Sequence, residues 1–149
     1  MGVNGIEVVY IAGPLSARPG GRTQIQNVHR AIKALHELAD RGFAPLCPHL
    51  FHYADAQASR DYEEWMSIDF ALLRKCDALF RLEGESSGAD REVEQARLWE
   101  IPIACSFEEL ADLALASQSD RAGRIARRRG GNLSVQGFLA LQRLKGVAP

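Results

Sequence analysis

The chain has 149 residues and a mass of 16.4 kDa, a size that suits one domain with a single hydrophobic core. Hydrophobic residues make up 46% and charged residues 25%, and the net charge of -1 excludes a protein that binds nucleic acid through overall positive charge. No stretch approaches 18 consecutive apolar residues, and residues 1–7 lack the basic and apolar segments of a secretory signal. We therefore expect a cytoplasmic protein that does not enter a membrane.

The three cysteines support the same compartment. Cys47, Cys76 and Cys105 are far apart, odd in number and without a CxxC pair. Each lies in an apolar stretch, which predicts reduced thiols in the core of a cytosolic protein.

Short apolar runs alternate with helical patterns along the first 118 residues. The expected strands are residues 8–12, 43–47, 77–82 and 101–105, and the expected helices are 23–42, 62–75, 89–100 and 107–117. The segment between the second strand and the second helix has the composition of a polar loop. Strand–helix alternation with short connections predicts an α/β fold: a doubly wound, mostly parallel sheet with helices on both faces, similar to flavodoxin and Rossmann folds.

The first predicted helix has the clearest boundaries. Thr23 and Gln26 have the spacing of a capping box, and Gly42 suits the helix end. An apolar stripe is expected to face the sheet. It consists of Ile25, Val28, Ile32, Leu35 and Leu38.

Residues 119–149 differ from the rest of the chain in charge. They hold seven basic residues and one acidic residue, so 7 − 1 = +6, which leaves −7 for the remainder. We expect a basic linker followed by an amphipathic helix over 133–144 that docks on this chain or on a neighbour. The cluster 127–131, three arginines and two glycines, could instead bind a phosphate or a nucleic acid, although a solvated linker or an oligomer contact is the favoured interpretation.

In a doubly wound sheet the ligand crevice lies at the carboxyl ends of the strands. The loop that follows the first strand contains glycines and two arginines, which could close on a phosphate or carboxylate. A flexible connecting loop is the alternative. The candidate binding residues in this loop are Gly13, Pro14, Arg18, Gly20, Gly21 and Arg22.

Asp69 is a candidate proton donor. It lies on one helix face with Trp65, Leu72 and Cys76, and a carboxylate in an apolar stripe is costly unless it is paired. Burial would raise its pKa, as proton donation requires. An aspartate at the edge of the stripe, bonded to a loop N–H, remains the structural alternative, and Asp77 is expected to be a turn residue.

The turn after the third strand opens the next helix. We expect Glu92 in the first helical turn, where the positive helix end favours an ionised carboxylate. Ser86 or Ser87 could cap the helix or donate to a ligand oxygen. Acidic residues also occupy first turns for stability alone, so position by itself does not assign Glu92 a function.

Two histidines follow the second strand. His49, His52 and Asp55 are close enough in sequence to suggest a metal site, but their spacing is a weak signal, and a substrate contact or a plain loop is the preferred interpretation. His29 and His36 are expected on the surface of the first helix.

Three short motifs occur in order within residues 8–105: 9–13, then 68–69 with 76–79, then 86–88 with 92–96. Together they resemble the nucleoside 2-deoxyribosyltransferase superfamily, including related hydrolases of nucleoside 5′-monophosphates. The resemblance implies that residues 1–118 form the family's doubly wound domain. It also implies a small-molecule nucleoside or nucleotide substrate, no cofactor or metal, and a homo-oligomer whose neighbouring subunit completes the pocket.

The resemblance further assigns roles to residues. Glu92 would be the nucleophile that attacks the anomeric carbon, Tyr10 would orient it, and Asp69 would handle the base or the sugar hydroxyls. A carboxylate beside the anomeric carbon stabilises oxocarbenium character and can form a covalent glycosyl-enzyme. Gly13 would let the base or sugar approach the backbone.

Two features resemble the monophosphate hydrolases more than the transferases. Ser86, followed by Gly88, stands where the transferases tend to carry an aspartate, and the segment 18–22 resembles a glycine- and arginine-rich phosphate loop. Both favour a 5′-phosphorylated substrate. A sensor or interaction module that binds nucleotides without catalysis is the alternative on the same fold, and a metal-dependent hydrolase using His49 and His52 is a third.

Overall fold

The computed structural model describes the backbone of residues 5–129 and the side chains of residues 5–119. Four parallel strands form the sheet in the order β2-β1-β3-β4. Their bounds are Val8–Ala12 for β1, Ala44–Leu46 for β2, Ala78–Arg81 for β3 and Ile103–Ala104 for β4. The predicted α/β fold with a parallel sheet is therefore confirmed, each strand being at most a few residues shorter than expected.

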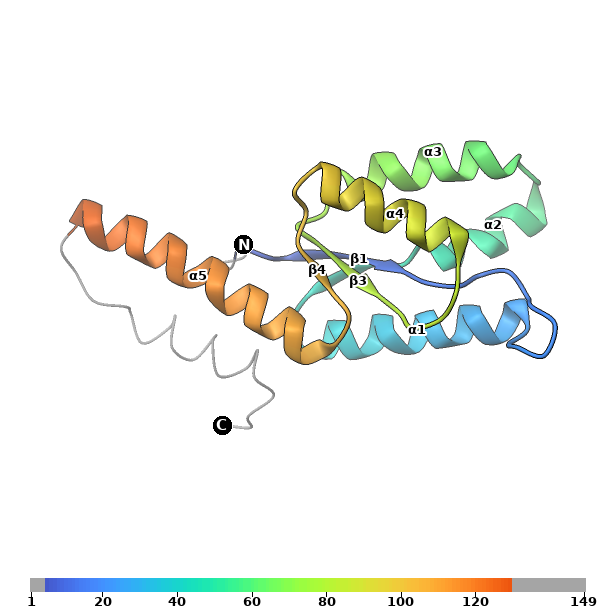
Figure 1. Ribbon diagram of the computed structural model, residues 1–149, viewed down its shortest axis with the longest axis horizontal. Helices are drawn as coiled ribbons and strands as arrows, with labels where there is room; N and C mark the ends of the chain where they lie inside the picture. Colours follow the sequence, from blue (N-terminus) through green and yellow to red (C-terminus); the bar gives the residue numbers. More distant parts are fainter. Residues whose placement is uncertain (1–4, 130–149) are drawn as a thin grey trace.

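Helices cover both faces of this sheet (Figure 1). The bounds are Gln24–Asp40 for α1, Tyr62–Leu73 for α3, Ser87–Leu98 for α4 and Phe107–Arg129 for α5. Val9 and Ile11 of β1 pack in the core that includes α1 and α5, whereas Tyr10 and Ala12 pack in the core that includes α3 and α4. Because side chains alternate along a strand, β1 contributes to both cores and places Tyr10 on the α3–α4 side.

The capping box of α1 is present as predicted. The Thr23 hydroxyl accepts the backbone N–H of Gln26 at 3.2 Å, and the Gln26 side chain accepts the N–H of Thr23 at 2.9 Å. Gly42 ends the helix with φ 90°, a conformation that favours glycine.

The predicted apolar stripe of α1 is partly wrong. Ile25 is 43% exposed, and the buried face contains Asn27 and Val28 in its first turns. The Asn27 amide donates to the carbonyls of Leu15 and Ser16, both at 3.2 Å, so this side of the helix faces the loop after β1. Ile25 lies two residues before Asn27, about 200° around the helix axis, and it therefore points outward.

Residues 48–57 form helices where a polar loop was expected. The 3₁₀ turn η1 (Pro48–Leu50) leads directly into α2 (Phe51–Gln57). The Phe51 ring stacks on Trp65 of α3 with centroids 5.4 Å apart, and the Trp65 indole donates to Asp55 at 2.7 Å. A seven-residue helix is marginal on its own, so these contacts with α3 stabilise it.

The last helix is longer than predicted. The basic linker expected from residue 119 is, through Arg129, a continuation of α5, because no proline interrupts the segment before the glycine pair at 130–131. The helix expected over 133–144 lies outside the described residues. Within the described part of the chain, no helix is long and apolar enough to cross a membrane.

The cysteines are placed only partly as predicted. Cys47 and Cys76 are buried free thiols, whereas Cys105 is a free thiol on the surface. Cys105 directly follows the two-residue strand β4 at the sheet edge, where the chain turns out toward α5. His29 and His36 are exposed on α1 as expected.

We predict that Thr23→Ala lowers the free energy of unfolding by about 1 kcal/mol, because the first turn of α1 loses its side-chain acceptor. Urea denaturation with a circular-dichroism readout measures the difference. Thr23→Ser keeps the hydroxyl and should stay close to wild type. Equal midpoints for Thr23→Ala and Thr23→Ser would contradict a stabilising role for the cap.

Candidate active site

One pocket of about 230 Å³ opens at the carboxyl ends of β1 and β3, where the predicted crevice lies. Its walls come from the loop after β1, the segment η1–α2, helix α3 and the turn that begins α4. Five of the predicted substrate-binding residues line it, and so do Ser87, His49 and His52. The five are Gly13, Pro14, Arg18, Ser86 and Gly88.

A buried hydrogen bond holds Glu92, one of the residues that line the pocket. The Tyr10 hydroxyl donates to Oε1 of Glu92 at 2.6 Å, which joins β1 to α4. Tyr10 is fully buried and Glu92 is 7% exposed. Burial and the adjacent carboxylates raise the pKa of Tyr10, so the phenol stays protonated and is a permanent donor.

Two expectations about Glu92 are wrong. Helix α4 begins at Ser87 after the cap Ser86, so Glu92 lies in the second turn, and the acidic residue of the first turn is Asp90. Burial, with the nearby charge of Asp69, raises the pKa of Glu92 to about 8, although the Tyr10 hydrogen bond and the charge of Arg81 oppose this. Desolvation thus outweighs the helix dipole, and the carboxyl keeps its proton to a higher pH than usual.

Asp69 approaches the same space from α3. Its Oδ1 is buried without a hydrogen-bond partner among the described residues, so no loop N–H satisfies that oxygen. Burial raises its pKa to about 6, as the sequence pattern predicted. Between about pH 6 and pH 8 the carboxyls of Asp69 and Glu92 together hold one proton.

The turn that begins α4 brings Ser86 and Gly88 to the pocket. The Ser86 hydroxyl accepts the N–H of Ala89 at 3.1 Å, which confirms it as the helix cap. A Cβ on Gly88 would lie 3.2 Å from the Tyr62 hydroxyl, so a larger residue there would crowd the entrance. Gly13 is more constrained, since a Cβ would lie 2.8 Å from Cβ of Leu82.

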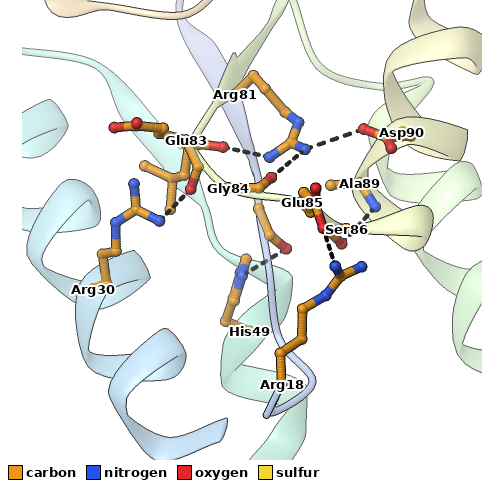
Figure 2. A network of polar contacts seen from close by, with 12 residues as sticks. Arg18, Arg30, His49, Arg81, Glu83, Gly84, Glu85, Ser86, Ala89 and Asp90 are labelled. Carbon is orange, nitrogen blue, oxygen red and sulfur yellow. Dashed lines mark hydrogen bonds and ion pairs between the residues drawn. The ribbon is translucent and has the colours of Figure 1, made fainter. Parts of the chain in front are cut away.

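Three arginines hold the turn between β3 and α4 (Figure 2). Arg81 donates to the carbonyls of Leu82 and Gly84, and its guanidinium lies 3.1 Å from the Asp90 carboxylate. Arg30 of α1 donates to the carbonyl of Glu83, and Arg18 forms an ion pair with Glu85. The loops after β1 and β3 are thereby tied together at the pocket mouth.

The predicted phosphate loop is divided by the fold. Gly20, Gly21 and Arg22 do not line the pocket, in contrast to Arg18. Arg22 instead borders a shallow depression on the outer side of α1, together with Arg30. Gly20 has φ 70°, which turns the chain away from the pocket toward the start of α1.

His49 has a structural contact that the sequence did not indicate. Its Nε2 lies 3.2 Å from the Gly13 carbonyl and 3.1 Å from the Pro14 carbonyl, so this nitrogen carries the proton and donates. Burial lowers its pKa, which keeps the ring neutral. Within residues 5–119, no group of three His, Cys, Asp or Glu side chains is arranged to hold a metal ion.

The aromatic wall of the pocket was missed by the sequence analysis. Phe51, Tyr62 and Trp65 line it together with Met66. Phe51 was assigned to a loop, so its stacking on Trp65 was not expected. The placement of Trp65 one turn before Asp69 was the signal that could have found this wall.

Asp77 also has a role beyond a turn. Its Oδ2 accepts the backbone N–H groups of Glu7 and Val8, at 2.9 and 2.8 Å. This contact fixes the start of β1 against the segment that leads into β3. It therefore also fixes the position of Tyr10 relative to α4.

We predict that Glu92→Gln stabilises the protein at high pH. The folded-state pKa of Glu92 is raised from 4.5 to about 8, so wild type loses unfolding free energy as the pH rises through this range. Glutamine stays neutral and still accepts from Tyr10. Urea denaturation at pH 5 and pH 9 should show the gain at pH 9 exceeding that at pH 5 by at least ~1 kcal/mol.

The matched control for this prediction is Glu94→Gln, which removes an exposed carboxylate from the same helix. It should show a much smaller change between the two pH values. A gain for Glu92→Gln that is the same at pH 5 and pH 9 would contradict a buried carboxyl of raised pKa.

Comparison with known proteins gives a family without an activity. No curated protein matches the chain, and no solved structure matches it. A family model described as "Domain of unknown function (DUF7768)" matches residues 7–106. This range, about two thirds of the chain, contains all four strands and every residue that lines the pocket. The chain therefore belongs to the DUF7768 family.

Proposed function

We propose that this protein cleaves or transfers at the N-glycosidic bond of a (2′-deoxy)nucleoside or its 5′-monophosphate, through a covalent intermediate on Glu92. The observation that carries the proposal is the buried hydrogen bond from Tyr10 to Glu92, with Asp69 in the same pocket. Two carboxyls and a fixed phenol are the groups that a retaining glycosyl transfer uses. The resemblance of the three motifs to the nucleoside 2-deoxyribosyltransferase superfamily supports the same chemistry.

The proposed reaction has two steps. In the first, the free Oε2 of Glu92 bonds to the anomeric carbon while the glycosidic bond breaks, and its electron pair leaves with the base. Asp69 donates its proton to the departing base. In the second, water or another base attacks the anomeric carbon, Glu92 leaves as a carboxylate, and Asp69 takes back a proton.

Tyr10 acts by holding one carboxylate oxygen. Its hydroxyl occupies Oε1, which fixes the rotamer of Glu92 and leaves Oε2 for the sugar. The aromatic wall with Phe51 and Trp65 provides an apolar surface suited to a planar base. Water exclusion by this wall would strengthen the attraction between Glu92 and the positive charge that develops on the sugar.

The proton must move before the first step. Burial raises the pKa of Glu92 to about 8 and that of Asp69 to about 6, so Glu92 holds its proton more tightly than Asp69. Placing it on Asp69 instead costs free energy, because the pKa of Glu92 is the higher of the two. Oxocarbenium character beside Glu92 favours its ionised form, which offsets this cost in the transition state.

Four further expectations belong to this proposal. We expect a homo-oligomer in which a neighbour completes the pocket, and the 55% exposed Tyr62 at the mouth supports an additional contact there. We expect no cofactor and no membrane contact. The free thiols support the cytoplasm as the compartment.

A sensor module that binds nucleotides without turnover is the second candidate. The open pocket and its capped helix start would serve binding equally well. The raised pKa values of Asp69 and Glu92 favour the enzyme, because a pocket used only for binding gains nothing from two destabilised carboxylates. A metal-dependent hydrolase is disfavoured because Nε2 of His49 is engaged by two carbonyls and Asp55 by Trp65.

The first test is chromatography of free base after incubation with a panel of nucleosides and 5′-monophosphates, with and without a second base. Base release without an acceptor indicates a hydrolase, and exchange that needs an acceptor indicates a transferase. Glu92→Ala should remain folded and lose turnover. Turnover by folded Glu92→Ala would refute the nucleophile, and binding without any turnover by wild type would favour the sensor.

We predict a bell-shaped pH dependence of kcat/KM, with limbs near pH 6 and pH 8, because the active form holds one proton on the carboxyl pair. Tyr10→Phe removes a hydrogen bond that lowers the pKa of Glu92, so the upper limb should move to higher pH while the maximum falls. Tyr53→Phe is the control, because the Tyr53 side chain is exposed and does not line the pocket. An unchanged upper limb in Tyr10→Phe would contradict the role of this phenol.

A further inference from the structure

More acidic than basic side chains line the pocket. Among the described residues, four carboxylate side chains line it: Asp55, Asp69, Glu85 and Glu92. Arg18 is the one arginine or lysine in the same lining. A phosphorylated ligand would therefore enter a pocket whose acids outnumber its permanent cations.

Arg18 is already engaged. Its guanidinium forms an ion pair with Glu85 across the mouth, between the loop after β1 and the turn after β3 (Figure 2). The Arg18 side chain is 53% exposed and that of Glu85 is 84% exposed, so the pair lies at the entrance and not in the core. A phosphate that reached Arg18 would have to displace the Glu85 carboxylate and then remain close to it.

The neighbouring arginines are also committed. Arg81 donates to the carbonyls of Leu82 and Gly84 and pairs with Asp90, and Arg30 donates to the carbonyl of Glu83. Neither lines the pocket. These contacts hold the turn that carries Glu85, so freeing either guanidinium for a ligand would release the turn itself.

One feature of the pocket, the start of helix α4, favours an anionic ligand. The start of α4 faces the pocket through Ser87 and Gly88, and the positive end of a helix attracts anions. Glu85 stands directly before the cap of this helix, however, and its carboxylate opposes that partial charge at the same place. Replacing Glu85 would thus both free Arg18 and uncover the helix end.

We propose that Glu85 is the residue that makes this pocket select against phosphorylated ligands, by occupying Arg18 and repelling an anion at the mouth. The inference rests on the proposed function, because it takes a nucleoside as the uncharged ligand. It contrasts with the sequence features that favoured a 5′-phosphate, since of the predicted phosphate segment 18–22 Arg18 lines the pocket and Gly20, Gly21 and Arg22 do not.

Calorimetric titration tests this inference, and it measures binding without depending on catalysis. The probes are the four common 2′-deoxynucleosides, their 5′-monophosphates and inorganic phosphate, titrated into the full chain carrying Glu92→Gln so that no ligand is consumed. With Glu85 intact, at least one nucleoside should bind more tightly than its monophosphate. Adding Glu85→Gln should raise affinity for the monophosphate and for phosphate roughly three- to tenfold, with the nucleoside unchanged.

Glu83→Gln is the matched control. It removes the same charge two positions before Glu85, and the Glu83 side chain does not line the pocket. It should leave all affinities within twofold. Tighter binding of the monophosphate with Glu85 intact, equal effects of Glu85→Gln on both ligand classes, or equal effects of the two variants would each overturn the inference.

The titration and the base-release assay together separate this inference from the proposed function. If the binding pattern is as expected but wild type releases no base, the proposed reaction is refuted and the role of Glu85 is supported. Base release with a preference for the monophosphate would support the reaction and overturn the role of Glu85. Binding of none of the probes would overturn both.

Discussion

The hydrogen bond from Tyr10 to Glu92 depends on the central strand, and the rest of the site depends on that bond. Because β1 is covered on both faces, its alternation sends Val9 and Ile11 into one core and Tyr10 into the other. Tyr10 therefore emerges beneath α4, where its hydroxyl reaches Glu92 at 2.6 Å. A shift of β1 by one residue would move the phenol to the opposite face and leave the carboxyl buried without a donor.

This burial has an electrostatic consequence. Glu92 and Asp69 lie in a space that offers little solvation, so each carboxyl holds its proton to higher pH than usual. The site is consequently destabilised in its fully ionised form, a condition typical of catalytic carboxyls and costly for a structural role. The presence of two buried carboxyls of raised pKa distinguishes this pocket from an ordinary surface crevice.

The mouth of the pocket has a different organisation from its floor. The floor is neutral to negative and buried, whereas the mouth is an exposed network in which Arg18, Arg30 and Arg81 hold the turn after β3. Arginine suits this task because its planar group donates to several carbonyls at once. The cost is that the cations near the pocket serve the protein's own backbone and carboxylates, which leaves little positive charge for a ligand.

The sequence alone determined the α/β alternation, the capping box at Thr23 and Gln26, and the three residues Tyr10, Asp69 and Glu92 as candidates. These depend on periodicity, local hydrogen bonding and short motifs, which act over a few neighbouring residues. Tertiary structure decided the helix at residues 51–57, which is stabilised by stacking of Phe51 on Trp65, and the inward turn of Asn27 in place of Ile25. It also decided that burial raises the pKa of Glu92 and that Arg18 pairs with Glu85, because desolvation and ion pairing depend on groups that are distant in the chain.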